Sequence, residues 1–160
     1  MKIMNSTKNS LSADTRKKVI RLLNQTLADL SDLYSQSKQA HWNVRGPNFY
    51  SLHKLFDDLA GMVEPHLDSI AERTTALGGV AQGTVRQAAA QSNLAEFPTK
   101  PAGGMDFVAA LVERYAGCAN ATRKAIDQSA AAGDADTADL FTEISRDLDK
   151  ALWFLEAHTQ

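Results

Sequence analysis

Carboxylates and a histidine recur at helical spacing in one part of the chain. His53 and Asp57 are four residues apart, and so are Asp68 and Glu72, so each pair shares one face of a helix. Asp57 and Asp68 are eleven residues apart, which at about 100° per residue brings them back to within about 20°. The resulting stripe offers the mixed oxygen and nitrogen ligands that suit iron. The alternative is that these are ordinary solvated residues on an exposed helix face.

The two pairs are too far apart to bind one metal cluster within a single chain. At a rise of about 1.5 Å per residue, Asp57 and Asp68 are separated by roughly 16 Å along the helix axis. Both pairs are centred on the same point, midway between residues 62 and 63. A two-fold axis at that point would lay the helix antiparallel to its copy. His53 and Asp57 of one chain would then face Asp68 and Glu72 of the other.

His41 and two small residues complete this arrangement. His41 ends the preceding helical segment, across a turn at 43–47, and could stand at the height of His53. Ala60 and Gly61 lie near the proposed axis and are small enough to let the two helix backbones approach. We therefore predict two identical sites between subunits, each formed by His41, His53 and Asp57 of one chain with Asp68 and Glu72 of its partner.

Four long segments have apolar residues at helical spacing, and none alternates as a strand does. They span about 14–42, 48–77, 105–130 and 136–157. Gly and Pro residues separate them, and Asp134 or Asp136 is a candidate N-cap for the last. The connection at 80–103 is long, with room for a short helix at 84–94. Two helical hairpins joined by one long crossover predict an all-α, ferritin-like four-helix bundle in which the second and third long helices run parallel.

Composition limits the alternatives. A chain of 160 residues with one cysteine indicates one domain and excludes a disulfide framework. No apolar run approaches the roughly 18 residues of a membrane span, and the N-terminal region lacks the apolar stretch of a secretory signal. We therefore expect a cytoplasmic protein without a membrane partner.

The charge is distributed unevenly along the chain. The net charge is −2, but residues 1–18 hold five lysines and arginines against one aspartate, which leaves −6 on the rest. We interpret residues 1–13 as a flexible, weakly basic tail that could touch DNA, and residues 14–160 as the bundle domain. The alternative is a solvated tail without a partner. The chain as a whole is far from the strongly basic surface of a dedicated nucleic-acid binder.

Two runs of residues are distinctive. The first is 38–49 (KQAHWNVRGPNF), followed by Leu52 and His53, and the second is 66–73 (HLDSIAER); residues 145–150 (SRDLDK) with Trp153 add to them. Together they resemble the Dps family, the mini-ferritins also known as DNA-binding proteins from starved cells. The resemblance extends over about residues 22–156.

This resemblance implies a hollow shell of twelve subunits that oxidises Fe(II), typically with hydrogen peroxide, and stores ferric mineral inside. Such a ferroxidase protects DNA and the cell from oxidative stress. The family's two-iron ligands fall onto His41, His53, Asp57, Asp68 and Glu72 at dimer interfaces, and zinc or another divalent metal can substitute. Trp42 matches a family tryptophan that quenches stray radicals near the site. Acidic pores at three-fold axes, near the start of the last helix, admit iron, and our candidates there are Asp136, Asp139 and Glu143.

Two residues depart from the expected pattern. Pro65 lies three residues before Asp68 and should bend the helix, and Glu64 adds negative charge near the proposed axis. We expect the bend to re-aim Asp68 and Glu72. His66 and His158 are interpreted as surface or packing residues, and Cys118 as a core residue.

Two other functions remain open. One is a nucleoid-associated shell that mainly binds and condenses DNA, with iron storage secondary. The other is a monomeric di-iron oxygenase on the same bundle, which would need ligands from all four long helices. The third and fourth of these helices have no histidine before His158, which argues against the oxygenase.

Overall fold

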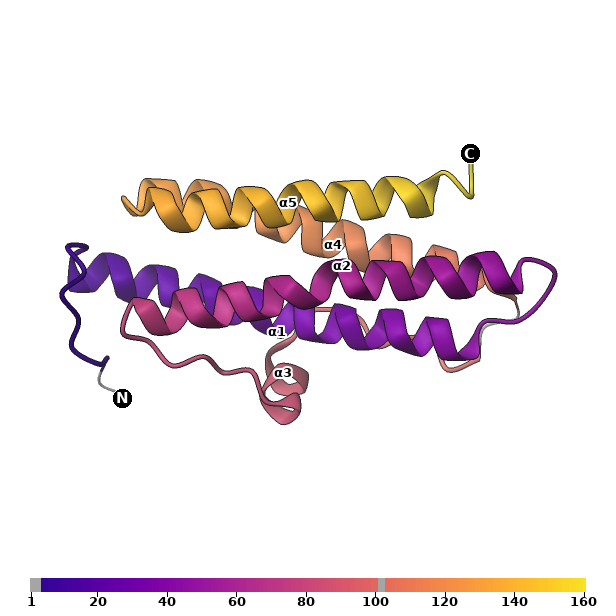
Figure 1. Cartoon of the computed structure of the whole chain (residues 1–160), viewed down its shortest axis with the longest axis horizontal. Helices are drawn as coiled ribbons and strands as arrows, with labels where there is room; N and C mark the ends of the chain where they lie inside the picture. The colour runs from indigo at the N-terminus through magenta and orange to yellow at the C-terminus, as the bar shows by residue number, and fades with distance from the viewer. Residues whose placement is uncertain (1–3, 101–102) are drawn as a thin grey trace.

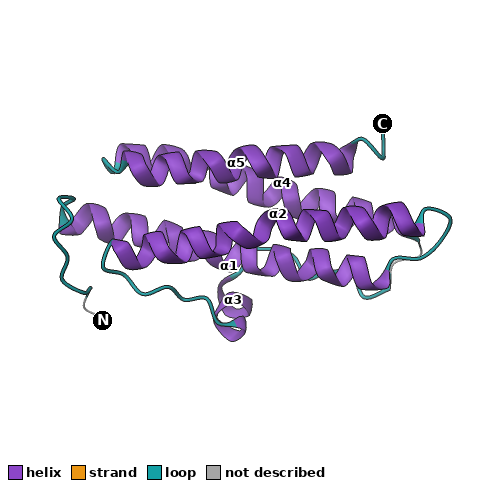
Figure 2. Cartoon of the chain, in the orientation of Figure 1, coloured by secondary structure: helices purple, strands orange, loops and turns teal. Residues whose placement is uncertain are grey.

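A computed structural model describes residues 4–100 and 103–160, which form five α-helices (Figure 1). They are α1 (Ala13–Asn43), α2 (Phe49–Ala76), α3 (Val85–Gln91), α4 (Gly104–Ala131) and α5 (Ala135–Glu156). No strand occurs in these described residues (Figure 2). The four long helices match the predicted segments to within a residue or two at each end, which confirms the all-α prediction. The predicted short helix in the crossover is confirmed as α3, shorter than the segment that had room for it.

The helix ends have local chemical causes. Ser12 caps α1 by accepting a hydrogen bond from the Thr15 N–H, and Asp134 caps α5 by accepting one from the Thr137 N–H. Of the two predicted N-cap candidates for α5, Asp134 is therefore the cap. After α2, Gly78 has φ +84°, a conformation that favours glycine and lets the chain turn away.

The long helices form two hairpins, α1 with α2 and α4 with α5, that pack into one bundle. In Figure 1 the crossover after α2 returns along the bundle, so α2 and α4 run in the same direction, as predicted. The apolar stripes of all four helices meet in a shared core. Its largest fully buried side chains include Leu23, Leu33, Phe56, Leu59, Ile70, Leu111, Tyr115, Phe141 and Ile144.

Polar side chains of α1 hold the crossover in place. Buried Asp29 accepts hydrogen bonds from the Asn93 N–H at 2.7 Å and from Gln25 at 3.1 Å. The Asp32 carboxylate accepts one from the Ser92 hydroxyl at 2.7 Å. Burial raises the pKa of Asp29 above its ordinary value, and these hydrogen bonds partly offset that effect. The long connection is thus fixed against α1, and α3 packs there.

The N-terminal segment, predicted as a flexible tail, contacts the body where α2 ends. The Asn5 N–H donates to the Gly78 carbonyl at 2.8 Å. A Cβ at position 78 would lie 2.6 Å from the Asn5 carbonyl oxygen, so glycine is required there for space as well as for φ. Residues 1–3, and with them Lys2, lie outside the described residues. None of the described helices combines the length and apolar character needed to cross a membrane.

Candidate metal centre

His41 and His53 interlock where α1 and α2 meet. The His41 Nδ1 lies 2.7 Å from the His53 carbonyl oxygen, and the His53 Nδ1 lies 2.8 Å from the His41 carbonyl oxygen. The two rings stack with centroids 3.8 Å apart. Because a carbonyl oxygen only accepts, each Nδ1 carries the proton and donates it. In the neutral form of each ring this arrangement leaves the Nε2 lone pair for a metal, which is how histidine ligands are commonly oriented.

The local cause is the end of α1. This helix ends at Asn43, so the His41 carbonyl is among the last carbonyls of a helix, which have no partner within it. His53, in the second turn of α2, supplies the missing donor. The His41 side chain is only 14% exposed, so this geometry is shielded from water.

Asp57 lies one turn further along α2 and adds a carboxylate to the two imidazoles. Its Oδ1 is 3.9 Å from the His41 Nε2 and 2.6 Å from the Lys38 Nζ. The hydrogen bond from Lys38 holds the pKa of Asp57 below its ordinary value, and the pKa of Lys38 is raised in turn. Asp57 is therefore kept as the carboxylate that a metal requires. Lys38 was not identified from the sequence, although its position three residues before His41 places it on the same face of α1.

A groove of about 480 Å³ runs along α2 from Asp57 toward the proposed two-fold axis. Its lining includes Lys38 and Asp57 at one end and Gly61 and Glu64 at the other. A Cβ added at Gly61 would meet nothing within 4 Å, so the helix backbone is open here. Ala60, the other small residue predicted near the axis, also lines this groove, although it is buried in the core of the same chain. Both small residues therefore border the open space along α2.

Asp68 and Glu72 are exposed on α2 and are not gathered with the histidines. Within residues 4–100 and 103–160, no three or more His, Cys, Asp or Glu side chains come together to hold a metal ion. His41 and His53 stack on each other and Asp57 lies near His41, but within one chain these three do not form a metal-binding group. Asp68 and Glu72 lie separately on the same helix.

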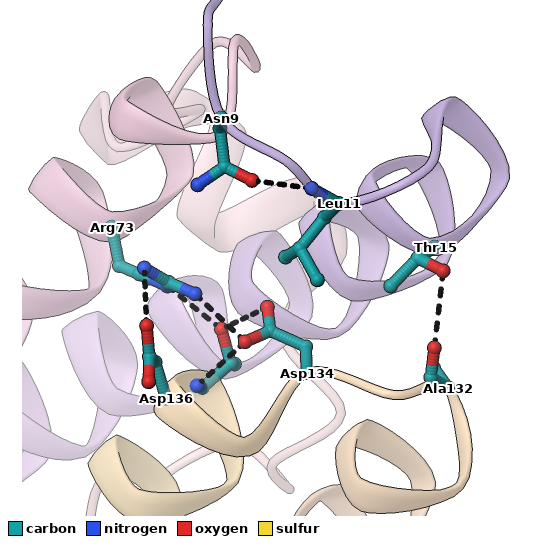
Figure 3. Close-up of polar contacts among 8 residues, drawn as sticks. Asn9, Leu11, Thr15, Arg73, Ala132, Asp134 and Asp136 are labelled. Carbon is teal, nitrogen blue, oxygen red and sulfur yellow. Dashed lines mark hydrogen bonds and ion pairs between the residues drawn. The ribbon is translucent and has the colours of Figure 1, made fainter.

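The opposite face of this part of α2 is bound to α5. The buried His66 Nε2 lies 2.8 Å from Asp147 Oδ2, so His66 is a packing residue, as interpreted from the sequence, with a specific polar partner. Figure 3 shows the Arg73 guanidinium between the carboxylates of Asp134 and Asp136. Its Nη2 donates to the Asp134 Oδ1 at 2.7 Å, and its Nε donates to the Thr137 hydroxyl at 2.8 Å. The sequence offered no signal for either pairing, because the partners are more than sixty residues apart.

The predicted uptake residues differ in their surroundings. Asp136 is exposed but lies 3.8 Å from Arg73, which offsets part of its charge. Asp139 and Glu143 are exposed one and two turns further along α5. They form no ion pair with the residues that the structure describes, so no cation lies beside either carboxyl group.

Three other residues singled out from the sequence have simpler surroundings. Trp42 is 67% exposed, and Lys38 lies over its ring at 5.9 Å from the ring centre. Cys118 is buried, and burial raises the pKa of its thiol, which keeps it in the unreactive protonated form. His158 is exposed just beyond α5 and bonds to the Phe154 carbonyl at 2.8 Å.

Two helical hairpins joined by a crossover are the architecture of a ferritin-like domain. The family model of the ferritin-like domain matches residues 20–160 of this chain. The chain is 48% identical to the DNA protection during starvation protein of Agrobacterium fabrum, over 96% of this chain and 95% of that protein. It is 34% identical to DNA protection during starvation protein 2 of Bacillus anthracis, over 88% and 96%. Among solved structures, DpsC from Streptomyces coelicolor superimposes with a TM-score of 0.93 at 31% identity, covering 98% of this chain and 92% of that one. The chain belongs to the Dps family of the ferritin-like superfamily.

Proposed function

We propose that this protein is a ferroxidase that oxidises Fe(II) with hydrogen peroxide and stores the product as ferric mineral. Two chains pair about a two-fold axis at the middle of α2. Each of the two resulting sites takes His41, His53 and Asp57 from one chain and Asp68 and Glu72 from the other. Six such pairs form a hollow shell of twelve subunits. Membership of the Dps family, with its iron-storage and DNA-protection roles, supports this assignment.

The observation that carries the proposal is the interlocked pair of histidines. Reciprocal Nδ1 bonds to carbonyl oxygens fix both rings and leave both Nε2 atoms available, with the Asp57 carboxylate 3.9 Å from one of them. We infer that these groups supply two nitrogen ligands and one oxygen ligand, which is half of the proposed site. Asp68 and Glu72 stand exposed on the same helix at the spacing that a two-fold axis needs to supply the remaining oxygen ligands.

The chemistry follows from the number of electrons. The reduction of hydrogen peroxide to water breaks the O–O bond and takes two electrons. Each Fe(II) supplies one of them. A site for two Fe(II) therefore completes the reduction in one event and releases no hydroxyl radical. Two Fe(II), one peroxide and two waters give two FeO(OH) and four protons. Lys38 is bonded to one oxygen of Asp57, so it would compete with iron for that oxygen. The exposed Trp42, over whose ring Lys38 lies, would be the residue that a stray radical oxidises.

Iron uptake is assigned to the start of α5. Asp139 and Glu143 present uncompensated carboxylates there, and Asp136 adds a charge reduced by Arg73. Around a three-fold axis each carboxylate would be present in three copies, which would attract Fe(II).

The test is anaerobic loading with Fe(II), followed by peroxide, with ferric absorbance as the readout. We expect about two Fe(II) to be consumed per peroxide. The variant Asp68→Ala/Glu72→Ala should still assemble but oxidise iron no faster than buffer does. Oxidation at the wild-type rate in this variant would refute the interface site.

The second candidate function is DNA condensation by the N-terminal segment, and it is considered because the relatives are named for DNA protection during starvation. Against it, Lys8 is the only cation among the described residues 4–12, and the Asn5 backbone is bonded to Gly78. A gel-shift series at rising salt tests it, because phosphate contacts weaken steeply with salt. A shift at low salt that Lys8→Gln abolishes would support tail-mediated binding.

A further inference from the structure

Pro65 divides α2 just before its second pair of carboxylates. Proline has no N–H, so the carbonyl of Gly61, four residues earlier, loses its donor within the helix. The helix nevertheless continues to Ala76. Because its hydrogen-bond ladder is interrupted, the direction in which Asp68 and Glu72 point depends more on contacts with other helices than it would in a continuous ladder.

The first of those contacts comes one residue after the proline. The His66 side chain is 8% exposed, and its Nε2–H donates to Asp147 on α5 at 2.8 Å. Residues two apart on a helix point about 200° away from each other, so His66 and Asp68 lie on nearly opposite faces. Fixing His66 against α5 therefore fixes the rotation of the helix that aims Asp68 outward.

The second contact closes the same segment at its far end. Arg73 binds Asp134, which is 2% exposed, and also the Thr137 hydroxyl. Asp68 and Glu72 lie between His66 and Arg73 along α2. The partners of these two residues, Asp147 and Asp134, lie in α5 and at its N-cap. The histidine end of α2, in contrast, is bonded to α1.

We propose that His66 and Asp147 are positioning residues for the carboxylate half of the metal site. The inference rests on the proposed function. Neither side chain binds the metal. The pair sets the rotation of α2 after Pro65, so that Asp68 and Glu72 of one chain meet the histidines of its partner.

A purely structural role makes a different prediction. If Asp147 only satisfied a buried imidazole, its loss would lower stability and leave metal affinity unchanged. If the pair aims the carboxylates, its loss weakens metal binding in shells that are still assembled. Metal affinity measured apart from catalysis therefore separates the two roles.

The experiment compares three substitutions on α5. Asp147→Ala removes the acceptor, and Asp147→Asn keeps a carbonyl oxygen in its place. Asp149→Ala is the matched control, because Asp149 is similarly exposed and pairs with Arg123 of α4, away from α2. The iron-free protein is titrated with Co(II), followed by its visible absorption, and Fe(II) half-saturation is measured with peroxide. Particle size and the urea midpoint are recorded for each.

For Asp147→Ala we expect Co(II) affinity and Fe(II) half-saturation to weaken by about fivefold, somewhat less than when a direct outer-shell partner of a ligand is lost. The maximal rate should change by less than about twofold, because bound iron still meets the same ligands. Asp147→Asn should stay near wild type, and Asp149→Ala should leave the affinity unchanged.

Two outcomes would overturn the inference in different ways. If Asp147→Ala lowers the urea midpoint but binds Co(II) as the wild type does, the positioning role is wrong and the proposed function stands. If the wild type itself neither binds Co(II) nor oxidises iron faster than buffer, both fail. Should Asp147→Ala not assemble, Asp147→Ser also removes the carboxylate acceptor while staying polar, and unchanged Co(II) affinity there would equally overturn the inference.

Discussion

The two halves of α2 carry ligands of different kinds and are supported differently. In the first half, His53 and Asp57 face α1, whose His41 and Lys38 contact them directly, so all the residues of this half of the proposed site lie within one chain. In the second half, Asp68 and Glu72 face outward, and the supporting contacts to α5 are made by residues on other faces of the helix. If the proposed site is right, one helix holds one ligand set in place and presents the other to a partner. A single chain would then contain only incomplete sites.

The largest effect should come from mixing two inactive chains. His53→Ala/Asp57→Ala disables the first half, and Asp68→Ala/Glu72→Ala disables the second. In a mixed pair one site combines both defects, but the other combines the two intact halves. Random pairing in co-expressed shells should therefore restore about a quarter of the wild-type rate from two inactive parents. Peroxide-dependent ferric absorbance of the mixed shells measures this, and no recovery would place each site within one chain.

A smaller effect, on the free energy of unfolding, is expected when the Arg73–Asp134 ion pair that supports the second half of α2 is broken. Arg73→Ala leaves the buried Asp134 carboxylate without its cation, which should lower the free energy of unfolding by about 3 kcal/mol. Breaking the exposed Arg123–Asp149 pair by Arg123→Ala should cost less than about 1 kcal/mol. Urea unfolding of both variants measures the difference. If both variants lose the same free energy of unfolding, the contacts of Arg73 stabilise the protein no more than an exposed ion pair does.

Pro65→Ala tests the discontinuity between the halves. An N–H at position 65 can bond to the Gly61 carbonyl, so we expect α2 to be stabilised by about 1 kcal/mol or more, within the roughly 3 kcal/mol that separates proline from alanine in helices. The orientation of Asp68 and Glu72 should change with it, and Fe(II) half-saturation should move by about twofold. Unchanged iron affinity and oxidation rate would show that the proline does not re-aim these carboxylates.

The smallest effect concerns Lys38 in the first half. Lys38 lowers the pKa of Asp57, so this hydrogen bond contributes stability above the unfolded pKa and loses it as the pH falls through the folded value. Lys38→Gln should raise the pKa of Asp57 toward its ordinary value. Titration by ¹³C NMR with labelled aspartate follows it. Lys54→Gln should move the same pKa much less, since Lys54 is only a minor cause; equal shifts would contradict the assigned cause.

The sequence by itself determined the elements and the spacing along them. Apolar periodicity and breakers such as Gly78 and Gly133 placed the four long helices, because these signals are local and act within a few residues. The stripe from His53 to Glu72 followed from helix geometry alone, as did its symmetry about the middle of α2. The ferroxidase site and the flexible tail remain predictions, since they depend on a partner chain or on motion.

Only the tertiary structure decided how the ligands are held. The reciprocal bonds of His41 and His53 depend on how α1 and α2 dock side by side, and Lys38 reaches Asp57 for the same reason. His66 is hydrogen-bonded to Asp147, 81 residues away in the sequence, and Arg73 to Asp134, 61 residues away. Helical periodicity tells which face a residue occupies. It does not tell which helix, at which height, will lie against that face, because this is set by the packing of the whole core.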